Sequence, residues 1–466
     1  MEELSAVTWV VLVVAGLVLL CSCTNPWRAL MAWVGALSIQ VPAVIIPGIR
    51  FAISDVFLVP MTALVLLGAA PRARRRSKSP ALRTGNLSVA IVVFAFLFLT
   101  LGNAMEYQNV GKLTSWTVVN KDIGLICLTV SYFVGLRLLD SRRRLYRIVE
   151  AFLVSGLVLN SFAVFGGALY YAFGIGNEMI RVGSSLRLCG FMMNPSSYGG
   201  WLLCVVSLQA AVLIGQSADI VRMSRKLQWM NLVLAVVAMV MTVSRSAYLG
   251  CLAAVFAVMF FGRARHALML LTAGACAVGF VIVLMLNSTA SGIINDFRLH
   301  VYNDTTIDER MTANEVGLGM VADSVANIYI GIGVGTFLER SGERDDTKGI
   351  MIHNTFLWIL VELGVVGLLA LLAILGAAFR NCWRVARRRG SERPIAVGVC
   401  CALIGSMFWF LGTEGLWHRH VWFLLLLSEA AVRTCANLDG SRTPLRGGDW
   451  RGKRQVVAQF DCAAPS

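Results

Sequence analysis

A small set of cationic side chains stands where a membrane protein normally avoids charge. His353 opens the segment HNTFLWILVELGVVG, directly after a polar stretch at residues 288–350. Arg187 lies in RLCGFMMNPSSYGGW, and Arg245 lies in TVSRSAYLG, a very short turn between two apolar runs. A charge in or near hydrocarbon is costly unless it is paired or functional. The positions of these three side chains therefore indicate a site.

Arg181, in the same segment as Arg187, and Arg310, within the polar stretch, extend this set. Guanidinium groups bind diphosphates through forked, charge-assisted hydrogen bonds and stabilise the charge that a leaving diphosphate develops. A neutral imidazole accepts protons near neutral pH. We therefore predict that the arginines clamp a diphosphate leaving group while His353 takes the proton of an attacking hydroxyl.

The arginines also have ordinary structural interpretations. An arginine near the membrane interface can extend its charged end into water, and this would account for Arg187 and Arg245. Arg310 directly follows Asp308 and Glu309 in the sequence, so an ion pair with either carboxylate is the alternative there. These interpretations stay open at this point.

The residues after His353 predict how the imidazole is held. A helix turns about 100° per residue, so Gly364 and Gly367 fall about 20° and about 40° from the azimuth of His353, and Glu362 falls about 180° away. We therefore predict one helix that carries the imidazole at its solvent end. Its glycine stripe would let a neighbouring helix pack closely.

The composition places the elements that hold these residues in a membrane. Of the 466 residues, 57% are hydrophobic and 14% are charged, with a mean hydropathy of +0.72, as in polytopic membrane proteins. We predict a single all-α integral membrane domain over residues 1–466 with about 12 or 13 spans. The count depends on 29–47, which Pro42 and Pro47 interrupt and which could be re-entrant. The predicted spans are about 6–22, 29–47, 54–70, 88–105, 120–139, 148–173, 195–215, 229–243, 246–261, 267–287, 353–379, 395–411 and 418–433.

The net charge of +15 is distributed as a topology signal rather than as a nucleic-acid-binding surface. Basic clusters fall on alternate loops, as the positive-inside rule requires of a cytoplasmic face. This alternation makes 288–350 one extended extracytoplasmic loop, and the side of the N-terminus depends on whether 29–47 spans. The predicted cytoplasmic segments are 71–86, 140–147, 380–394 and 433–466, and we expect the basic tail at 434–466 to be disordered.

The extracytoplasmic loop has recognisable internal patterns. It carries ten acids against five Lys and Arg residues. Met311, Leu318, Val321 and Val325 recur at helical spacing, which predicts an amphipathic helix on the membrane or over a cavity. IGIGVGTF has the glycines of a phosphate-binding loop, but no Lys-Ser/Thr pair follows it. We therefore predict a tight, closely packed turn.

The sequence contains neither Cys/His metal-binding spacing nor an Asp-x-Asp pair. We expect no bound metal, no other cofactor, no structural disulfide and no nucleic-acid partner. Asp345 and Asp346, which we interpret as solvated surface, are the first candidates for metal ligands if that expectation is wrong.

Four motifs resemble, in order and spacing, the O-antigen ligase/polymerase superfamily of bacterial membrane glycosyltransferases. The resemblance covers residues 180–380 and implies a GT-C-type fold with metal-independent transfer of glycans from undecaprenyl pyrophosphate. It implies that Arg187 and Arg245 hold the pyrophosphate and that His353 is the base or positions the acceptor. Asn194 and Asn354 would form supporting hydrogen bonds. The motifs are RLCGFMMNPSSYGGW (187–201), TVSRSAYLG (242–250), IGIGVGTF (330–337) and HNTFLWILVELGVVGL (353–368).

Members of this superfamily differ in the acceptor, which the motifs do not reveal. We favour a repeat-unit polymerase in surface polysaccharide biosynthesis. The alternatives are a ligase that transfers glycan to lipid A-core, a protein O-oligosaccharyltransferase, and a non-enzymatic flippase or exporter of lipid-linked oligosaccharide. A flippase should line its path with charges at mid-membrane depth, whereas the charges here gather at one face. The resemblance implies a multi-pass protein of the bacterial inner membrane whose site faces the periplasm, with a flippase and a chain-length regulator as partners.

Overall fold

A computed structural model describes residues 16, 18–40, 42–46, 49–68, 85–111, 121–173, 187–192, 194–215, 220–261, 304–344, 351–388 and 390–441. Within these ranges the regular secondary structure is helical apart from one two-stranded hairpin. Five of the described helices are long and apolar enough to cross a membrane, and three more are apolar but shorter. The predicted class, an all-α polytopic membrane protein, is confirmed. The predicted span 267–287 lies outside the described residues.

The elements follow the predicted apolar runs closely. The first half contains α2 (Pro26–Gly35), β1 (Pro42–Ile46), β2 (Ile49–Ala52), α3 (Ile53–Leu66), α4 (Asn86–Leu97), the π-helix η1 (Phe98–Gly102), α5 (Asn103–Val110), α6 (Ile123–Leu138) and α7 (Arg142–Phe173). The second half contains α8 (Pro195–Gly215), α9 (Arg225–Met241), α10 (Arg245–Phe261), α13 (Asp304–Ala322), α14 (Val325–Ile330), α15 (Thr336–Arg344), α16 (Thr355–Ala386), α17 (Arg393–Trp409), the 3-10 turns η3 (Phe410–Gly412) and η4 (Gly415–Trp417), and α18 (Arg419–Ser441).

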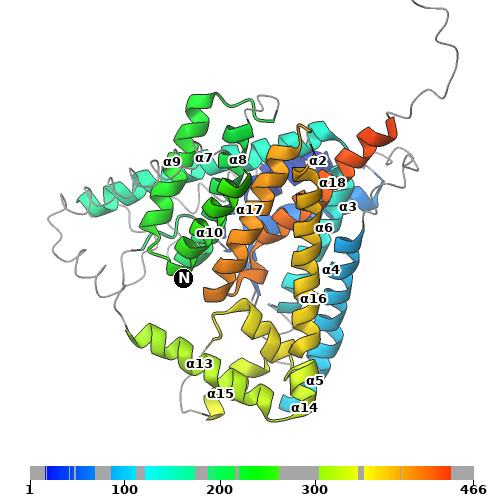
Figure 1. The fold of residues 1–466 in the computed structure, drawn as a ribbon, viewed down its shortest axis with the longest axis vertical. Coiled ribbons are helices and arrows are strands. Elements are labelled where there is room, and N and C mark those ends of the chain that lie inside the picture. Colours follow the sequence, from blue (N-terminus) through cyan, green and yellow to red (C-terminus); the bar gives the residue numbers. More distant parts are fainter. Residues whose placement is uncertain are drawn as a thin grey trace, which may run out of the picture.

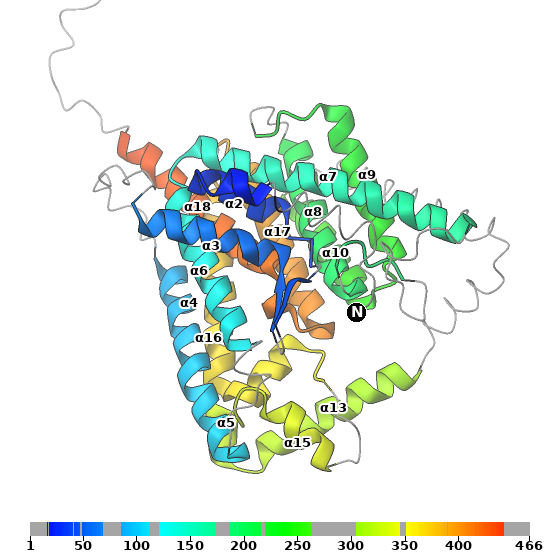
Figure 2. The same ribbon diagram turned by 180° about the vertical axis from the view of Figure 1, so that it is seen from behind.

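The helices divide the molecule into two ends (Figures 1 and 2). Helices α4 and α16 run along its long axis, and α13, α14, α15 and α5 gather at one end of them. Helices α2, α3 and α7 lie at the opposite end and run across that axis. At that end Arg142 pairs with Glu392, just before α17, and Arg144 lies over the ring of Trp27 in α2. Two of the predicted cytoplasmic loops, 140–147 and 380–394, therefore meet at the end opposite the polar loop.

The interior is built on α8, which is buried along nearly its whole length between α9, α10 and α17. Small residues allow this close packing, as in membrane helix pairs generally. A Cβ on Gly250 of α10 would lie 2.7 Å from the carbonyl oxygen of Gly405, and a Cβ on Gly405 of α17 would lie 2.6 Å from that of Gly250. Helices α10 and α17 thus touch backbone to backbone, and this contact fixes the N-terminal end of α10.

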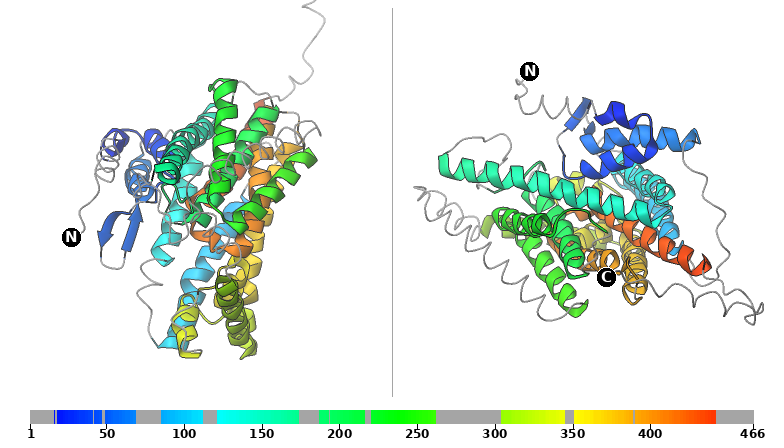
Figure 3. Two further views of the ribbon diagram at one scale, coloured as in Figure 1. Left: turned by 90° about the vertical axis from the view of Figure 1, so that its left-hand side faces the viewer. Right: turned by 90° about the horizontal axis from the view of Figure 1, so that it is seen from above.

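Residues 29–47 do not form one continuous helix, which agrees with the interruption predicted within this run. Helix α2 ends at Gly35, and the chain turns into the antiparallel hairpin β1–β2, which stands beside the helical bundle (Figure 3). The helix ends seven residues before Pro42, and this proline is the first residue of β1. Just before the hairpin, the N–H of Gln40 donates to the carbonyl of Phe191 at 3.0 Å, so this segment contacts the chain that follows Arg187.

The predicted uninterrupted helix after His353 is wrong. Helix α16 begins only at Thr355 and is broken at Gly364, whose φ of 65° and ψ of −167° are not helical. A Cβ on Gly364 would lie 2.4 Å from the carbonyl of Tyr329, so α14 packs directly against the kink. The angular relation predicted among His353, Gly364 and Gly367 does not apply across this break.

The predicted tight turn at IGIGVGTF is confirmed. Gly331, Gly333 and Gly335 all have positive φ, at 76°, 102° and 83°, a region that only glycine enters freely. A Cβ on Gly333 would lie 2.2 Å from the backbone nitrogen of Glu106 in α5. The N–H of Gly333 donates to the carbonyl of Glu362 at 3.0 Å. The kink in α16 leaves that carbonyl without its helical donor, and the glycine turn supplies one.

A helix, α13, exists where the sequence predicted an amphipathic helix, but its apolar residues are not segregated on one face, and its buried face differs from the predicted one. Ala313 and Met320 are buried together with Val321. Met311 and Leu318, which the spacing assigned to the same apolar stripe as Val321, remain about half exposed. The buried face of α13 packs against α14, α15 and α16. Helical periodicity alone does not show which side of α13 these neighbours cover.

Candidate functional site

The turn between α9 and α10 holds two of the predicted arginines together. Val243 has a φ of 47°, the one positive φ at a non-glycine residue within the described ranges, and this conformation is strained for a β-branched side chain. The carbonyl of Thr242, in the same turn, accepts a hydrogen bond from Nε of Arg187 at 3.0 Å. The strained turn therefore fixes the Arg187 guanidinium beside Arg245, the first residue of α10.

Serine hydroxyls join the N-termini of α8 and α10. The Oγ atoms of Ser196 and Ser246 are 3.1 Å apart, and those of Ser244 and Ser246 are 3.4 Å apart. Nε1 of Trp409 donates to the carbonyl of Ser196 at 3.0 Å, which anchors the start of α8 on α17. Ser244 and Ser246 flank Arg245 in the chain, and the sequence analysis did not identify them as site residues. The Ser-Arg-Ser sequence at 244–246 is the signal that could have identified Ser244 and Ser246.

The N-terminus of α16 is pinned directly after His353. Oδ1 of Asn354 accepts hydrogen bonds from the N–H groups of Phe356 and Leu357 at 3.0 and 3.2 Å, so Asn354 is the helix cap. The Thr355 hydroxyl donates to the carbonyl of Thr413 at 2.6 Å. The partly buried imidazole of His353 therefore extends from a backbone that the helix cap and the α17–α18 connection hold in place.

The connection between α17 and α18 also joins the start of α16 to the start of α10. A Cβ on Gly412 would lie 2.7 Å from Cβ of Ser246, and Thr413 is the next residue in the chain. The N-termini of α8, α10 and α16 are thus linked by Ser196, Ser246 and Thr355. A helix N-terminus carries unpaired N–H groups and a partial positive charge, so this junction favours an anion.

Arg187, Arg245 and Arg310 lie within electrostatic range of one another, and His353 lies within range of Arg310. Burial lowers the pKa of Arg187, and the charges of Arg310 and Arg245 lower it further. Burial also lowers the pKa of Arg310, with a further contribution from Arg245. Among the described side chains, no carboxylate forms an ion pair with any of the three arginines. The cluster therefore presents positive charge that no described carboxylate neutralises through an ion pair.

His353 is suited to accept a proton in this setting. Burial lowers the pKa of its imidazole below the ordinary 6.5, and the charge of Arg310 lowers it further. The ring is therefore neutral at pH 7 and able to act as a base. The ion pair considered for Arg310 with Asp308 or Glu309 is not formed in this part of the structure; Arg310 instead faces Arg245 and His353.

The two predicted asparagines lie at the site as helix caps. Oδ1 of Asn194 accepts from the N–H of Ser196 at 2.7 Å at the start of α8, and its side chain is exposed. Asn354 has the same position at the start of α16. Whether either also binds substrate stays a prediction. Arg181 lies outside the described residues.

The structure also contains a buried ion pair that the sequence reasoning missed, between Lys121 and Glu362 in the first part of α16. Nζ of Lys121 lies 3.2 Å from both carboxylate oxygens of Glu362, and the two side chains are only 7% and 2% exposed. The ammonium also lies 4.6 Å from the ring centroid of Trp358. Lys121 stands in the apolar run 120–139, and a charge within a predicted span was the available signal.

Across the described ranges, no group of three or more His, Cys, Asp and Glu side chains is arranged to hold a metal ion. Asp345 and Asp346 lie outside those ranges.

Comparison with known proteins adds one finding. Residues 230–372 match the family model described as O-antigen ligase. The matched range contains Arg245, Arg310 and His353 and ends beyond the kink in α16, whereas Arg187 precedes it. No curated protein matches this chain.

Proposed function

Since this chain belongs to the O-antigen ligase/polymerase superfamily of glycosyltransferases, we propose that it transfers glycan from undecaprenyl pyrophosphate to an acceptor hydroxyl. The reaction takes place at the periplasmic face of the inner membrane. The observation that carries the proposal is the cluster of Arg187, Arg245 and Arg310 beside a neutral His353. Such a cluster fits a ligand with several negative charges, and a lipid-linked diphosphate is the activated glycan that is available outside the cytoplasm.

The proposed step is a displacement at the anomeric carbon of the donor sugar. The acceptor oxygen forms the new glycosidic bond as the bond from the anomeric carbon to the diphosphate oxygen breaks. The electron pair of the broken bond remains on the diphosphate, whose charge the guanidiniums stabilise. The acceptor proton passes to the imidazole of His353. The products are the transferred glycan and free lipid pyrophosphate.

The acceptor that we propose is a second lipid-linked repeat unit, which makes the protein a polysaccharide polymerase. Ligation to lipid A-core is the second candidate, because the matching family model is described as O-antigen ligase. The gathering of cations at one junction of helix ends, rather than along a path through the helices, favours an enzyme over a flippase.

The proposal is tested with purified protein in nanodiscs, a lipid-pyrophosphate oligosaccharide donor, and either a second repeat unit or lipid A-core as acceptor. We expect transfer without nucleotide and in the presence of EDTA, with longer glycans from the repeat-unit acceptor. Product only on lipid A-core would assign the ligase reaction. Loss of transfer in EDTA with recovery in magnesium would contradict the metal-independent displacement.

The side of the membrane is tested separately with alkaline phosphatase fusions. We expect activity from a fusion after residue 340 and none from a fusion after residue 78, because basic loops stay in the cytoplasm. The reverse pattern would place the site away from lipid-linked donors and would overturn the proposed function.

A further inference from the structure

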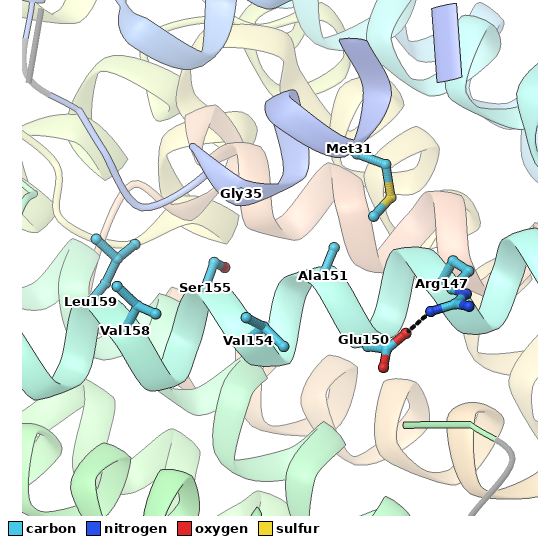
Figure 4. A pocket seen from close by; sticks show the side chains of 9 residues that line it. All are labelled: Met31, Gly35, Arg147, Glu150, Ala151, Val154, Ser155, Val158 and Leu159. Carbon is cyan, nitrogen blue, oxygen red and sulfur yellow. Dashed lines mark hydrogen bonds and ion pairs between the residues drawn. The ribbon is translucent and has the colours of Figure 1, made fainter. Parts of the chain in front are cut away.

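A groove at the end of the molecule opposite the arginine cluster has no role in the proposed transfer. It lies between α2 and α7 and encloses about 520 Å³. Figure 4 shows Met31 and Gly35 of α2 on one side and the side chains of α7 on the other. Its lining is mainly apolar, and Val154 and Val158 remain about 42% and 46% exposed. The groove is therefore open along one face of α7.

The groove continues into a basic pocket. A second cavity of about 420 Å³ lies at the N-terminal end of α7, and Arg147 and Glu150 line both spaces. The other residues that line the second cavity are Arg142, Arg143, Tyr146, Ile220 and Arg222. One continuous site therefore has an apolar part and a part with four arginines.

The single carboxylate that lines the basic pocket is already satisfied. Oε2 of Glu150 accepts from Nη1 of Arg147 at 2.8 Å, and its Oε1 accepts from the backbone N–H of Arg222 at 2.9 Å. Arg142 pairs with Glu392 outside the pocket. Arg143 and Arg222 form no ion pair with any described side chain, and both are exposed. Two guanidiniums thus remain available for an anion.

We propose that this site binds an anionic phospholipid, with the phosphodiester between Arg143 and Arg222 and an acyl chain along the groove between α2 and α7. Basic pockets between helices on the positively charged side of a membrane protein have this specificity, and guanidiniums bind phosphate through paired hydrogen bonds. A free phosphate would use only the basic pocket, whereas the continuous apolar groove matches a chain attached to the headgroup. The bound lipid would fill the gap between α2 and α7 and so stabilise their packing.

The test is lipid retention by the purified full-length protein, measured by native mass spectrometry with phosphatidylglycerol, phosphatidylcholine or inorganic phosphate. We expect phosphatidylglycerol to be retained and to raise the melting temperature, and the other two to do neither. Each basic residue near an anionic headgroup contributes a factor of about five to binding, so the double variant Arg143→Ala/Arg222→Ala should bind about 25-fold more weakly. The matched control Arg225→Ala/Lys226→Ala removes the same charge from the neighbouring turn and should bind normally.

Gly35→Leu tests the apolar half without a change of charge. A Cβ on Gly35 would meet no atom within 4 Å, so the larger side chain fits the fold and occupies the groove. We expect reduced retention of phosphatidylglycerol by a protein that remains monodisperse. Equal weakening in the matched control, equal retention of phosphatidylcholine, or competition by inorganic phosphate would each overturn the proposal. Normal retention of phosphatidylglycerol by Gly35→Leu would show that no acyl chain lies in the groove between α2 and α7.

Discussion

The arginine cluster lies beside His353, just before α16, and the Lys121–Glu362 pair lies at the first part of α16, before the kink at Gly364. The two regions differ in the groups that their charges contact. Arg187, Arg245 and Arg310 face one another and no described carboxylate, at a junction of helix N-termini. Lys121 instead lies against both oxygens of a buried carboxylate. Uncompensated charge is retained where a ligand supplies the counter-charge, whereas compensated buried charge holds helices in register.

The largest effect on transfer is expected from His353→Gln. Loss of a general base lowers the rate by about 10²–10⁴-fold, while donor binding should persist because the arginines remain. The pH profile identifies the base. Because burial and Arg310 lower the pKa of His353, the wild-type rate should fall only at pH values below the ordinary 6.5.

Two outcomes bear on this assignment. In Arg310→Ala the imidazole loses a neighbouring positive charge, so its pKa rises and the acid limb should move to higher pH. An acid limb that survives unchanged in His353→Gln would show that another group is the base and would leave His353 as a binding residue.

Arg187→Ala and Arg245→Ala should each lower transfer by about 10²–10³-fold, the range seen when one donor to a developing anion is removed. Lysine at either position should restore only part of the rate, because an ammonium cannot make the forked pair of hydrogen bonds. Arg225→Ala, at the other end of α9, is the matched control and should transfer normally. Full activity of Arg245→Ala would show that the arginine cluster does not bind the donor, and would contradict its contrast with the structural Lys121–Glu362 pair.

Lys121→Met should act on stability rather than on chemistry. It leaves Glu362 as an unpaired buried charge, which destabilises a protein by about 3–5 kcal/mol. Thermal unfolding of the purified protein should show this loss, and the double variant Lys121→Met/Glu362→Leu should recover most of it. If the double variant is as stable as wild type but inactive, the Lys121–Glu362 pair has a role in transfer, and its assignment as a purely structural ion pair is wrong.

The smallest effect is expected from Asn354→Ala. Loss of a helix cap costs about 0.5–2 kcal/mol, so the protein should accumulate with a slightly lower melting temperature and a modest fall in transfer. Asn354→Asp retains the capping oxygen and should restore stability. A loss of transfer as large as that of His353→Gln, without loss of stability, would indicate that Asn354 binds substrate.

Several features of the fold were predictable because they depend on local properties. Apolar runs such as 195–215 and 395–411 predicted helices α8 and α17, since a spanning helix must satisfy its backbone internally. The glycines of IGIGVGTF predicted a tight turn because positive φ favours glycine. The cations Arg187, Arg245, Arg310 and His353 were identifiable because each stands out in an apolar or acidic sequence.

Other features depended on contacts between distant segments and could not be read locally. The helical wheel placed Glu362 away from Gly364 on one helix. The backbone of α14 occupies the space at Gly364, and the turn at Gly333 supplies a donor to the carbonyl that the break exposes. The pairing of Lys121 with Glu362 joins residues far apart in the chain.

The sequence by itself determined the membrane class, the alternation of basic loops and the residue types of the site, because composition, charge and glycine content act locally. Only the tertiary structure decided that Arg187, Arg245 and Arg310 lie near one another and that the charge of Lys121 is neutralised by Glu362. The strain at Val243, the bond from Arg187 to Thr242 and the link through Ser246 to Gly412 arise when α8, α9, α10 and α16 pack together. The electrostatic character of a group depends on neighbours that only packing brings within a few ångströms.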